Sequence, residues 1–95
     1  MDIGVFVEGV SDRRIAKRIE RAVHAVAKKE ARSGEWRVLV APSETRGEWD
    51  VGVRSPGAHH FGSFRAEPEE LPQLVDLQFR AALATPASSA ENGWR

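Results

Sequence analysis

Residues 11–32 read SDRRIAKRIERAVHAVAKKEAR, and this stretch decides the fold because its apolar residues recur at steps of three and four. That spacing puts them on one side of an α-helix. The apolar side consists of Ile15, Ile19, Val23 and Val26, with Ala16, Ala22 and Ala27 beside them. Ser11 is a suitable N-cap, and Gly34 stands where a helix end is expected. The pattern predicts one long amphipathic helix that covers a small sheet.

The opposite face of this helix is strongly basic. Residues 11–32 contain eight cations and three acids, Asp12, Glu20 and Glu30, so their net charge is +5. The cations are Arg13, Arg14, Lys17, Arg18, Arg21, Lys28, Lys29 and Arg32. The whole chain is formally neutral, with 14 basic and 14 acidic residues. Such uneven charge suits an anion-binding face, self-association of unlike patches, or a solvated surface.

Four segments alternate apolar and polar residues as half-buried strands do. They are residues 3–8, 36–40, 49–54 and 59–65. The last follows Ser-Pro-Gly-Ala at 55–58, which has Pro and Gly at the two central positions of a type II turn. Trp36 and Trp49 are in phase with the apolar side of their strands, which predicts a core position, whereas Arg37 and Arg54 point to the other side.

Residues 67–84 form the second predicted helix, which opens with acids and Pro68, as helix starts tolerate. Pro72 fits poorly inside it because proline removes a backbone hydrogen bond. We therefore expect a short turn before a helix that begins near Pro72, or a distorted first turn. The apolar residues of this helix cover more than one face, which predicts further burial at a homodimer interface.

The element order predicts a single small α+β domain over residues 1–84, with a flexible tail at 85–95. The order is β-α-β-β-β-α, with a three- to four-stranded, mostly antiparallel sheet and two helices on one face. The order of the strands within the sheet stays open. Residues 1–10 resemble neither a secretory signal nor a membrane span, so we expect a cytoplasmic protein.

Several kinds of chemistry are disfavoured by the residue types present. The chain has no cysteine, which excludes disulfides, thiolate metal sites and a cysteine nucleophile. His59 and His60 are adjacent on a predicted strand and point to opposite faces, so they do not easily share a metal ion. No metal site, cofactor or catalytic constellation is predicted, which favours a protein that is not an enzyme.

Residues 5–12, VFVEGVSD, resemble the first motif of the Toprim family, the metal-dependent domain of topoisomerases and primases. In that family a glutamate at the strand end, matching Glu8, works in phosphoryl transfer beside a later Asp-x-Asp that holds magnesium. The resemblance implies a magnesium site built on Glu8. The nearest candidate for the second motif, Glu-Trp-Asp at 48–50, precedes an apolar strand instead of following one.

The element order and length are similar to those of the ribosome hibernation factors, small proteins that bind the small ribosomal subunit through basic helix faces. The basic first helix agrees with that family, whereas the acids of the second helix depart from it. A strand, a Pro-Gly turn, a second strand and a Glu-Glu-Leu helix start also resemble small antitoxins related to ribonuclease H.

Three functional hypotheses follow from these features. The first is a non-catalytic binding module that contacts nucleic acid or an acidic protein surface through the basic helix face. Its candidate partner-binding residues are Arg14, Lys17, Arg18, Arg21 and Lys28. The second is a Toprim-like enzyme that transfers phosphoryl groups with magnesium on Glu8. The third is an antitoxin-like or oligomeric interaction module that uses its sheet face.

Overall fold

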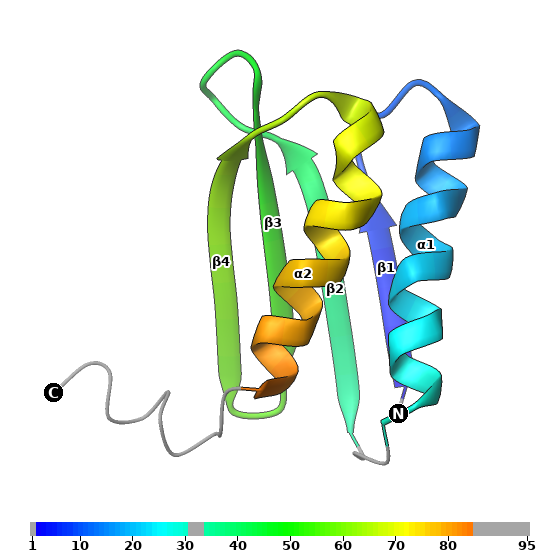
Figure 1. Ribbon diagram of the computed structural model, residues 1–95. Helices are drawn as coiled ribbons and strands as arrows, with labels where there is room; N and C mark the ends of the chain where they lie inside the picture. The colour runs from blue at the N-terminus through cyan, green and yellow to red at the C-terminus, as the bar shows by residue number, and fades with distance from the viewer. Residues whose placement is uncertain (1, 31–33, 85–95) are drawn as a thin grey trace, which may run out of the picture.

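A computed structural model describes residues 2–30 and 34–84 of the 95-residue chain. Figure 1 shows two layers, a four-stranded sheet and two helices on one of its faces. The elements are β1 (Asp2–Val7), α1 (Arg13–Lys28), β2 (Glu35–Pro42), β3 (Glu48–Ser55), β4 (Ala58–Arg65), the 3-10 turn η1 (Pro68–Glu70) and α2 (Leu71–Ala84). The predicted fold class and element order are confirmed. The tail predicted at 85–95 lies outside the described residues.

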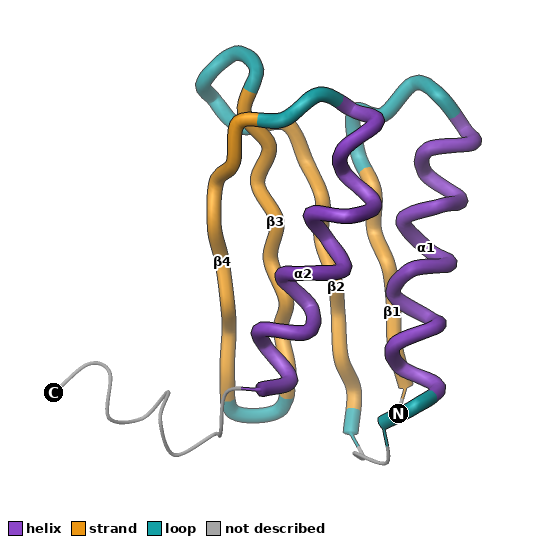
Figure 2. Tube along the Cα trace, in the orientation of Figure 1, coloured by secondary structure: helices purple, strands orange, loops and turns teal. Residues whose placement is uncertain are grey.

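The strands lie in the sheet in their sequence order, β1-β2-β3-β4. β1 and β2 are parallel, and the other neighbouring strands are antiparallel. A parallel pair needs a crossover connection, which α1 supplies, whereas the antiparallel pairs need only short turns. Figure 2 shows α1 over β1 and α2 over the middle of the sheet. The turn between β3 and β4 has Gly57 at φ +81°, as the predicted Pro-Gly turn requires.

The core fills the space between the sheet and the helices. Its buried members from the strands are Trp36, Val38, Val40, Trp49, Val51 and Val53. Those from the helices are Ile15, Ile19, Val23, Val26, Leu71, Val75, Phe79, Ala82 and Leu83. The predicted core positions of both tryptophans and of the apolar side of α1 are confirmed. Arg37 and Arg54 are exposed on the face away from the helices, as their strand phase predicts.

Helix α1 begins one residue later than its sequence signal indicates. Asp12 is the N-cap, with extended backbone (φ −86°, ψ 113°) and a carboxylate oxygen that accepts a hydrogen bond from the Arg14 N–H at 2.9 Å. The prediction of Ser11 as the N-cap was therefore wrong. Aspartate is as good a cap as serine, and the side chain that reaches the exposed N–H group takes the position. The regular helix ends at Lys28, short of the predicted residue 32.

Helix α2 follows one of the two arrangements expected around Pro72. The turn η1 precedes it, and the Glu70 carboxylate accepts a hydrogen bond from the Glu67 N–H at 2.9 Å. Pro72 is the second residue of α2. In the first turn of a helix the N–H groups have no acceptor within the helix, so the missing N–H of proline costs no helical hydrogen bond. Leu77 is 58% exposed, whereas most other apolar residues of α2 face the core.

Candidate functional site

The five predicted binding residues lie together on one side of α1. We call them the basic stripe: Arg14, Lys17, Arg18, Arg21 and Lys28. All five are exposed, and the buried residues of α1 are on the side that faces the sheet. From Arg14 to Lys28 the stripe runs about 21 Å along the helix, at about 1.5 Å per residue. The sequence pattern therefore placed these side chains correctly on one face, and their binding of a partner stays a prediction.

The basic stripe is not neutralised by acids within residues 2–30 and 34–84. None of its side chains takes part in an ion pair there, although ion pairs join Arg37 to Glu35, Arg65 to Glu48 and Arg80 to Asp76. Over Arg13–Lys28 there are six cations and a single acid, Glu20. The helix thus has a net charge of +5 and presents nearly all of it to solvent.

This arrangement costs the isolated domain some stability. Arg14 and Arg18, and likewise Lys17 and Arg21, are four residues apart, a spacing at which like charges repel by about 0.2–0.5 kcal/mol per pair. The first turn of α1 has no acidic residue, so Arg13 and Arg14 also lie at the positive end of the helix dipole. A bound anion relieves both repulsions.

The face of the sheet away from the helices is a second candidate surface. The hypotheses from sequence assigned no residues to it. Cross-strand pairing aligns four residues across it, which we call the aromatic row: Phe6, Leu39, Gly52 and Phe61. Three of these side chains are strongly exposed, Phe6 by 51%, Leu39 by 42% and Phe61 by 58%. Alternation already puts Phe6 and Leu39 on this face, but only the pairing register shows that they lie in one line.

A line of two arginines and a histidine runs beside the aromatic row. Its members, the arginine row, are Arg37, Arg54 and His59 on three successive strands. Arg37 and Arg54 are directly opposite each other, and the His59 ring lies 6.3 Å from the Phe61 ring, centroid to centroid. On the other side of the aromatic row, Glu8 follows β1 and Asp50 lies on β3.

The middle of this face is hollow because Gly52 has no side chain. The depression has a volume of about 440 Å³, and it is lined by Phe6, Glu8, Arg37, Leu39, Gly52, Arg54, His59 and Phe61. Its lining therefore combines exposed aromatic rings, cations and one carboxylate.

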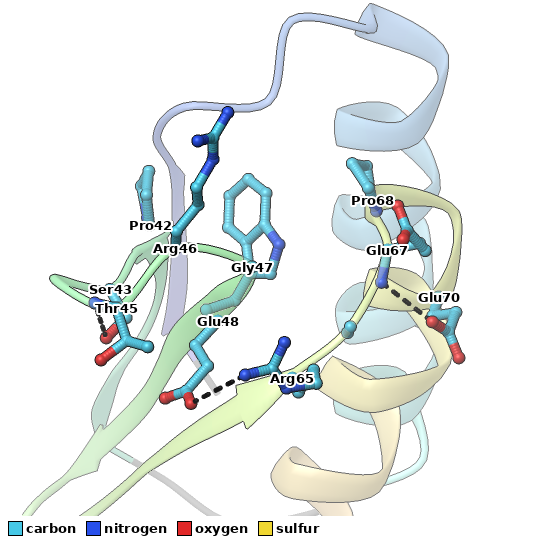
Figure 3. A pocket seen from close by; sticks show the side chains of 12 residues that line it. Pro42, Ser43, Thr45, Arg46, Gly47, Glu48, Arg65, Glu67, Pro68 and Glu70 are labelled. Carbon is cyan, nitrogen blue, oxygen red and sulfur yellow. Dashed lines mark hydrogen bonds and ion pairs between the residues drawn. The ribbon is translucent and has the colours of Figure 1, made fainter.

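A further depression, of about 500 Å³, lies at the end of the sheet between the β2–β3 loop and the start of α2 (Figure 3). Three of its charged side chains, those of Glu48, Arg65 and Glu70, have partners inside the chain. Arg65 lies 4.0 Å from Glu48, and Glu70 caps the Glu67 N–H. Figure 3 shows the Arg46 side chain projecting from the loop beside this depression. This mixture of positive and negative side chains favours no particular ligand.

The structure does not support the magnesium site implied by the Toprim resemblance. Within the described residues no group of three or more His, Cys, Asp or Glu side chains is arranged to hold a metal ion. Glu8 follows β1 and Asp50 is on β3, with β2 between these two strands. The Asp50 carboxylate accepts a hydrogen bond from the Ser63 hydroxyl at 2.6 Å. Gly9, the other half of the motif, is explained by a turn in which its φ is +75°.

In the part of the chain that the structure describes, no helix is both long and apolar enough to cross a membrane.

Comparison with known proteins finds similarity only at the level of whole structures. No protein-family model and no curated protein matches the chain. Among solved structures, it is similar to a ribosomal subunit interface protein from Coxiella burnetii, with a TM-score of 0.49 and 15% identity over 97% of this chain and 96% of that one. It is also similar to the N-terminal domain of Protein Y from Thermus thermophilus, with a TM-score of 0.49 and 12% identity over 97% of this chain and 98% of that one. Similarity this low identifies no binding residue of this chain.

Proposed function

We propose that this chain is a non-catalytic binding module whose basic stripe holds the phosphates of a nucleic acid. The observation that carries the proposal is the set of five exposed cations on one side of α1 without an acidic partner in the described residues. Lys and Arg arranged in this way contact phosphates and release condensed counterions, whatever the base sequence. Such contacts give affinity and position without reading sequence.

The principal alternative is that acids of a second copy neutralise the stripe. Two acids from the turn η1 and α2, Glu70 and Asp76, already have partners inside the chain. The Asp76 carboxylate already accepts two hydrogen bonds at 3.1 Å from the Arg80 guanidinium, and the Glu70 carboxylate caps the turn η1. Since these groups have partners inside the chain, an external polyanion is the better match for a net charge of +5 on α1. A homodimer remains a separate proposal.

The test is the binding of a fluorescent RNA duplex and of its single strands across a salt series. If three to five stripe residues contact phosphates, log K for the duplex falls with log salt at a slope of about −2.7 to −4.5. The variant Arg18→Glu/Arg21→Glu abolishes binding at moderate salt. The matched control is Arg46→Glu/Arg65→Glu, which makes the same change in net charge with two exposed arginines outside the stripe.

The two variants separate a local site from a general charge effect. If both reduce affinity equally, the protein responds only to net charge and the stripe is not a site. If wild-type protein fails to bind RNA or DNA even at low salt, the proposal is wrong, and an acidic protein surface becomes the partner to examine.

A further inference from the structure

We propose that the open face of the sheet is a second nucleic-acid site, specific for unpaired nucleotides. Bases stack on Phe6 and Phe61 of the aromatic row, and the phosphates lie along Arg37, Arg54 and His59 of the arginine row. Both rows are on the face away from the helices, so this site uses none of the residues of the basic stripe.

The aromatic row is unusual for a surface with no partner. Single exposed apolar residues are normal, but here three side chains that are each more than 40% exposed lie in one line across four strands. With strands about 4.8 Å apart, Phe6 on β1 and Phe61 on β4 are separated by about 14 Å, which spans several stacked bases at about 3.4 Å each. Exposed aromatic rings on a sheet are a recurrent platform for unpaired bases.

Gly52 provides an independent sign that something approaches this face. Glycine weakens the interior of a strand, and in a central strand it often marks a place where a ligand comes close to the backbone. Gly52 does not have a positive φ, and a Cβ at this position would make only ordinary contacts, 3.5 Å to His59 Nε2 and 3.6 Å to Phe61 Cδ2. Neither the backbone conformation nor the neighbouring side chains require glycine at position 52. The hollow that Gly52 leaves is therefore consistent with close approach of a ligand to the backbone.

The arginine row supplies the matching charge. Arg37 and Arg54 are directly opposite on neighbouring strands, an arrangement that destabilises a sheet through like-charge repulsion. Arg37 has an exposed ion pair with Glu35 at 3.1 Å, and Arg54 has none within the described residues. A phosphate between the two guanidinium groups removes the repulsion and accepts hydrogen bonds from both.

The acids on the far side of the aromatic row orient the bound nucleic-acid strand. Glu8 and Asp50 repel phosphates, so the sugar-phosphate chain stays over the arginine row while the bases extend across the rings. The Glu8 carboxylate, which lines the hollow, is placed to accept hydrogen bonds from the amino groups of adenine, cytosine or guanine. The same charge pattern disfavours a second copy as the occupant. A stable dimer buries about 800 Å² per partner around an apolar centre, whereas this face has one apolar line between two charged ones.

The experiment measures the binding of the full chain to three fluorescein-labelled probes. The probes are an eight-nucleotide oligoadenylate RNA, an abasic oligomer of the same length, and an RNA duplex. The test variants are Phe6→Leu/Phe61→Leu, which keeps apolar bulk but removes the aromatic faces, and Gly52→Val, which fills the hollow. The matched control is Phe64→Leu, the same substitution on β4 with the side chain on the helix-facing side.

The expected result is a loss that depends on bases and on single strands. The double Phe variant and Gly52→Val each lower the affinity for oligoadenylate by about fivefold or more. They leave the abasic oligomer and the duplex unchanged, and Phe64→Leu leaves all three affinities unchanged. Gly52→Val also retains or increases the midpoint of urea unfolding, which shows that the loss is not caused by misfolding.

Equal binding of oligoadenylate and the abasic oligomer by wild-type protein contradicts the proposal, because the bases then contribute nothing. Unchanged oligoadenylate binding by both test variants contradicts it as well. If light scattering gives twice the monomer mass and Phe61→Asp restores the monomer, the face is a dimer interface instead. None of these results affects the basic stripe, which is tested by the loss of duplex binding in Arg18→Glu/Arg21→Glu.

Discussion

The indole ring of Trp36 on β2 meets the phenyl ring of Phe79 on α2 edge to face, with ring centroids 6.1 Å apart and ring planes at 75°. Both residues are in the core, Trp36 at 4% and Phe79 at 0% exposure. Edge-to-face pairs are favourable beyond the area that they bury. This contact therefore holds α2 against the sheet. Because α1 lies beside α2 on the same face, it also helps to position the helical layer from which the cations of α1 project.

We expect Phe79→Ala to lower the free energy of unfolding by about 3–5 kcal/mol, because it leaves a cavity under α2 and removes the ring contact. Urea unfolding followed by tryptophan fluorescence measures the loss. Leu77→Ala, in the same helix but 58% exposed, is expected to change stability by less than about 0.5 kcal/mol. Similar losses in the two variants are inconsistent with the packing described here.

The cap of α1 provides a second test. Asp12→Ala removes the carboxylate that accepts from the Arg14 N–H, and we expect it to cost about 0.5–2 kcal/mol in the same unfolding measurement. Ser11→Ala is the control, since Ser11 lies outside the cap and its loss is expected to have little effect. A larger loss from Ser11→Ala than from Asp12→Ala contradicts this assignment.

The elements of the fold could be read from sequence because each carries a strong local signal. The apolar side of α1, the alternation in β2 and β3, and the Pro-Gly turn before β4 are decided by neighbours in the chain. The sequence could not decide between Ser11 and Asp12 as the N-cap of α1. Both residue types accept the same hydrogen bond, and only the local geometry selects one of them.

The candidate sites divide in the same way. The basic stripe depends on helical periodicity alone, so Arg14, Lys17 and Arg18 were placed on one face from sequence. The aromatic row depends on the register of three strand pairings, and one of these joins strands separated by all of α1. A shift of one residue in any pairing moves a side chain to the other face, so no local pattern predicts that Phe6 and Phe61 are in line.

Gly9 illustrates how a sequence motif acquires a structural explanation. Its φ is +75°, and a Cβ there would lie 2.7 Å from Pro42 Cδ, in a ring that cannot rotate away. We expect Gly9→Ala to combine the cost of a left-handed backbone, about 1–2 kcal/mol, with a steric cost of about 1–3 kcal/mol. Thermal or urea unfolding measures the total.

Gly57→Ala is the matched control for Gly9→Ala, because its φ is +81° but no atom lies within 4 Å of the added Cβ. It is expected to show the backbone cost alone. Equal destabilisation by the two substitutions excludes the proposed contact of Gly9 with Pro42.

The last prediction connects the stability of α1 with its proposed function. Arg14→Glu places an acid in the first turn, where the helix dipole favours it, and turns repulsion from Lys17 and Arg18 into attraction at three- and four-residue spacing. We expect the free energy of unfolding to rise by about 0.5–1.5 kcal/mol at low ionic strength, and this gain to shrink in 1 M salt because the charges are exposed. Affinity for duplex RNA is expected to fall in the same variant, with a salt slope shallower by about 1. Arg46→Glu, away from α1, is expected to alter neither quantity in this way. If Arg14→Glu raises the free energy of unfolding and lowers the affinity for duplex RNA, the charge of Arg14 contributes to binding and destabilises the fold. If the variant is less stable than the wild type, the electrostatic description of α1 is wrong.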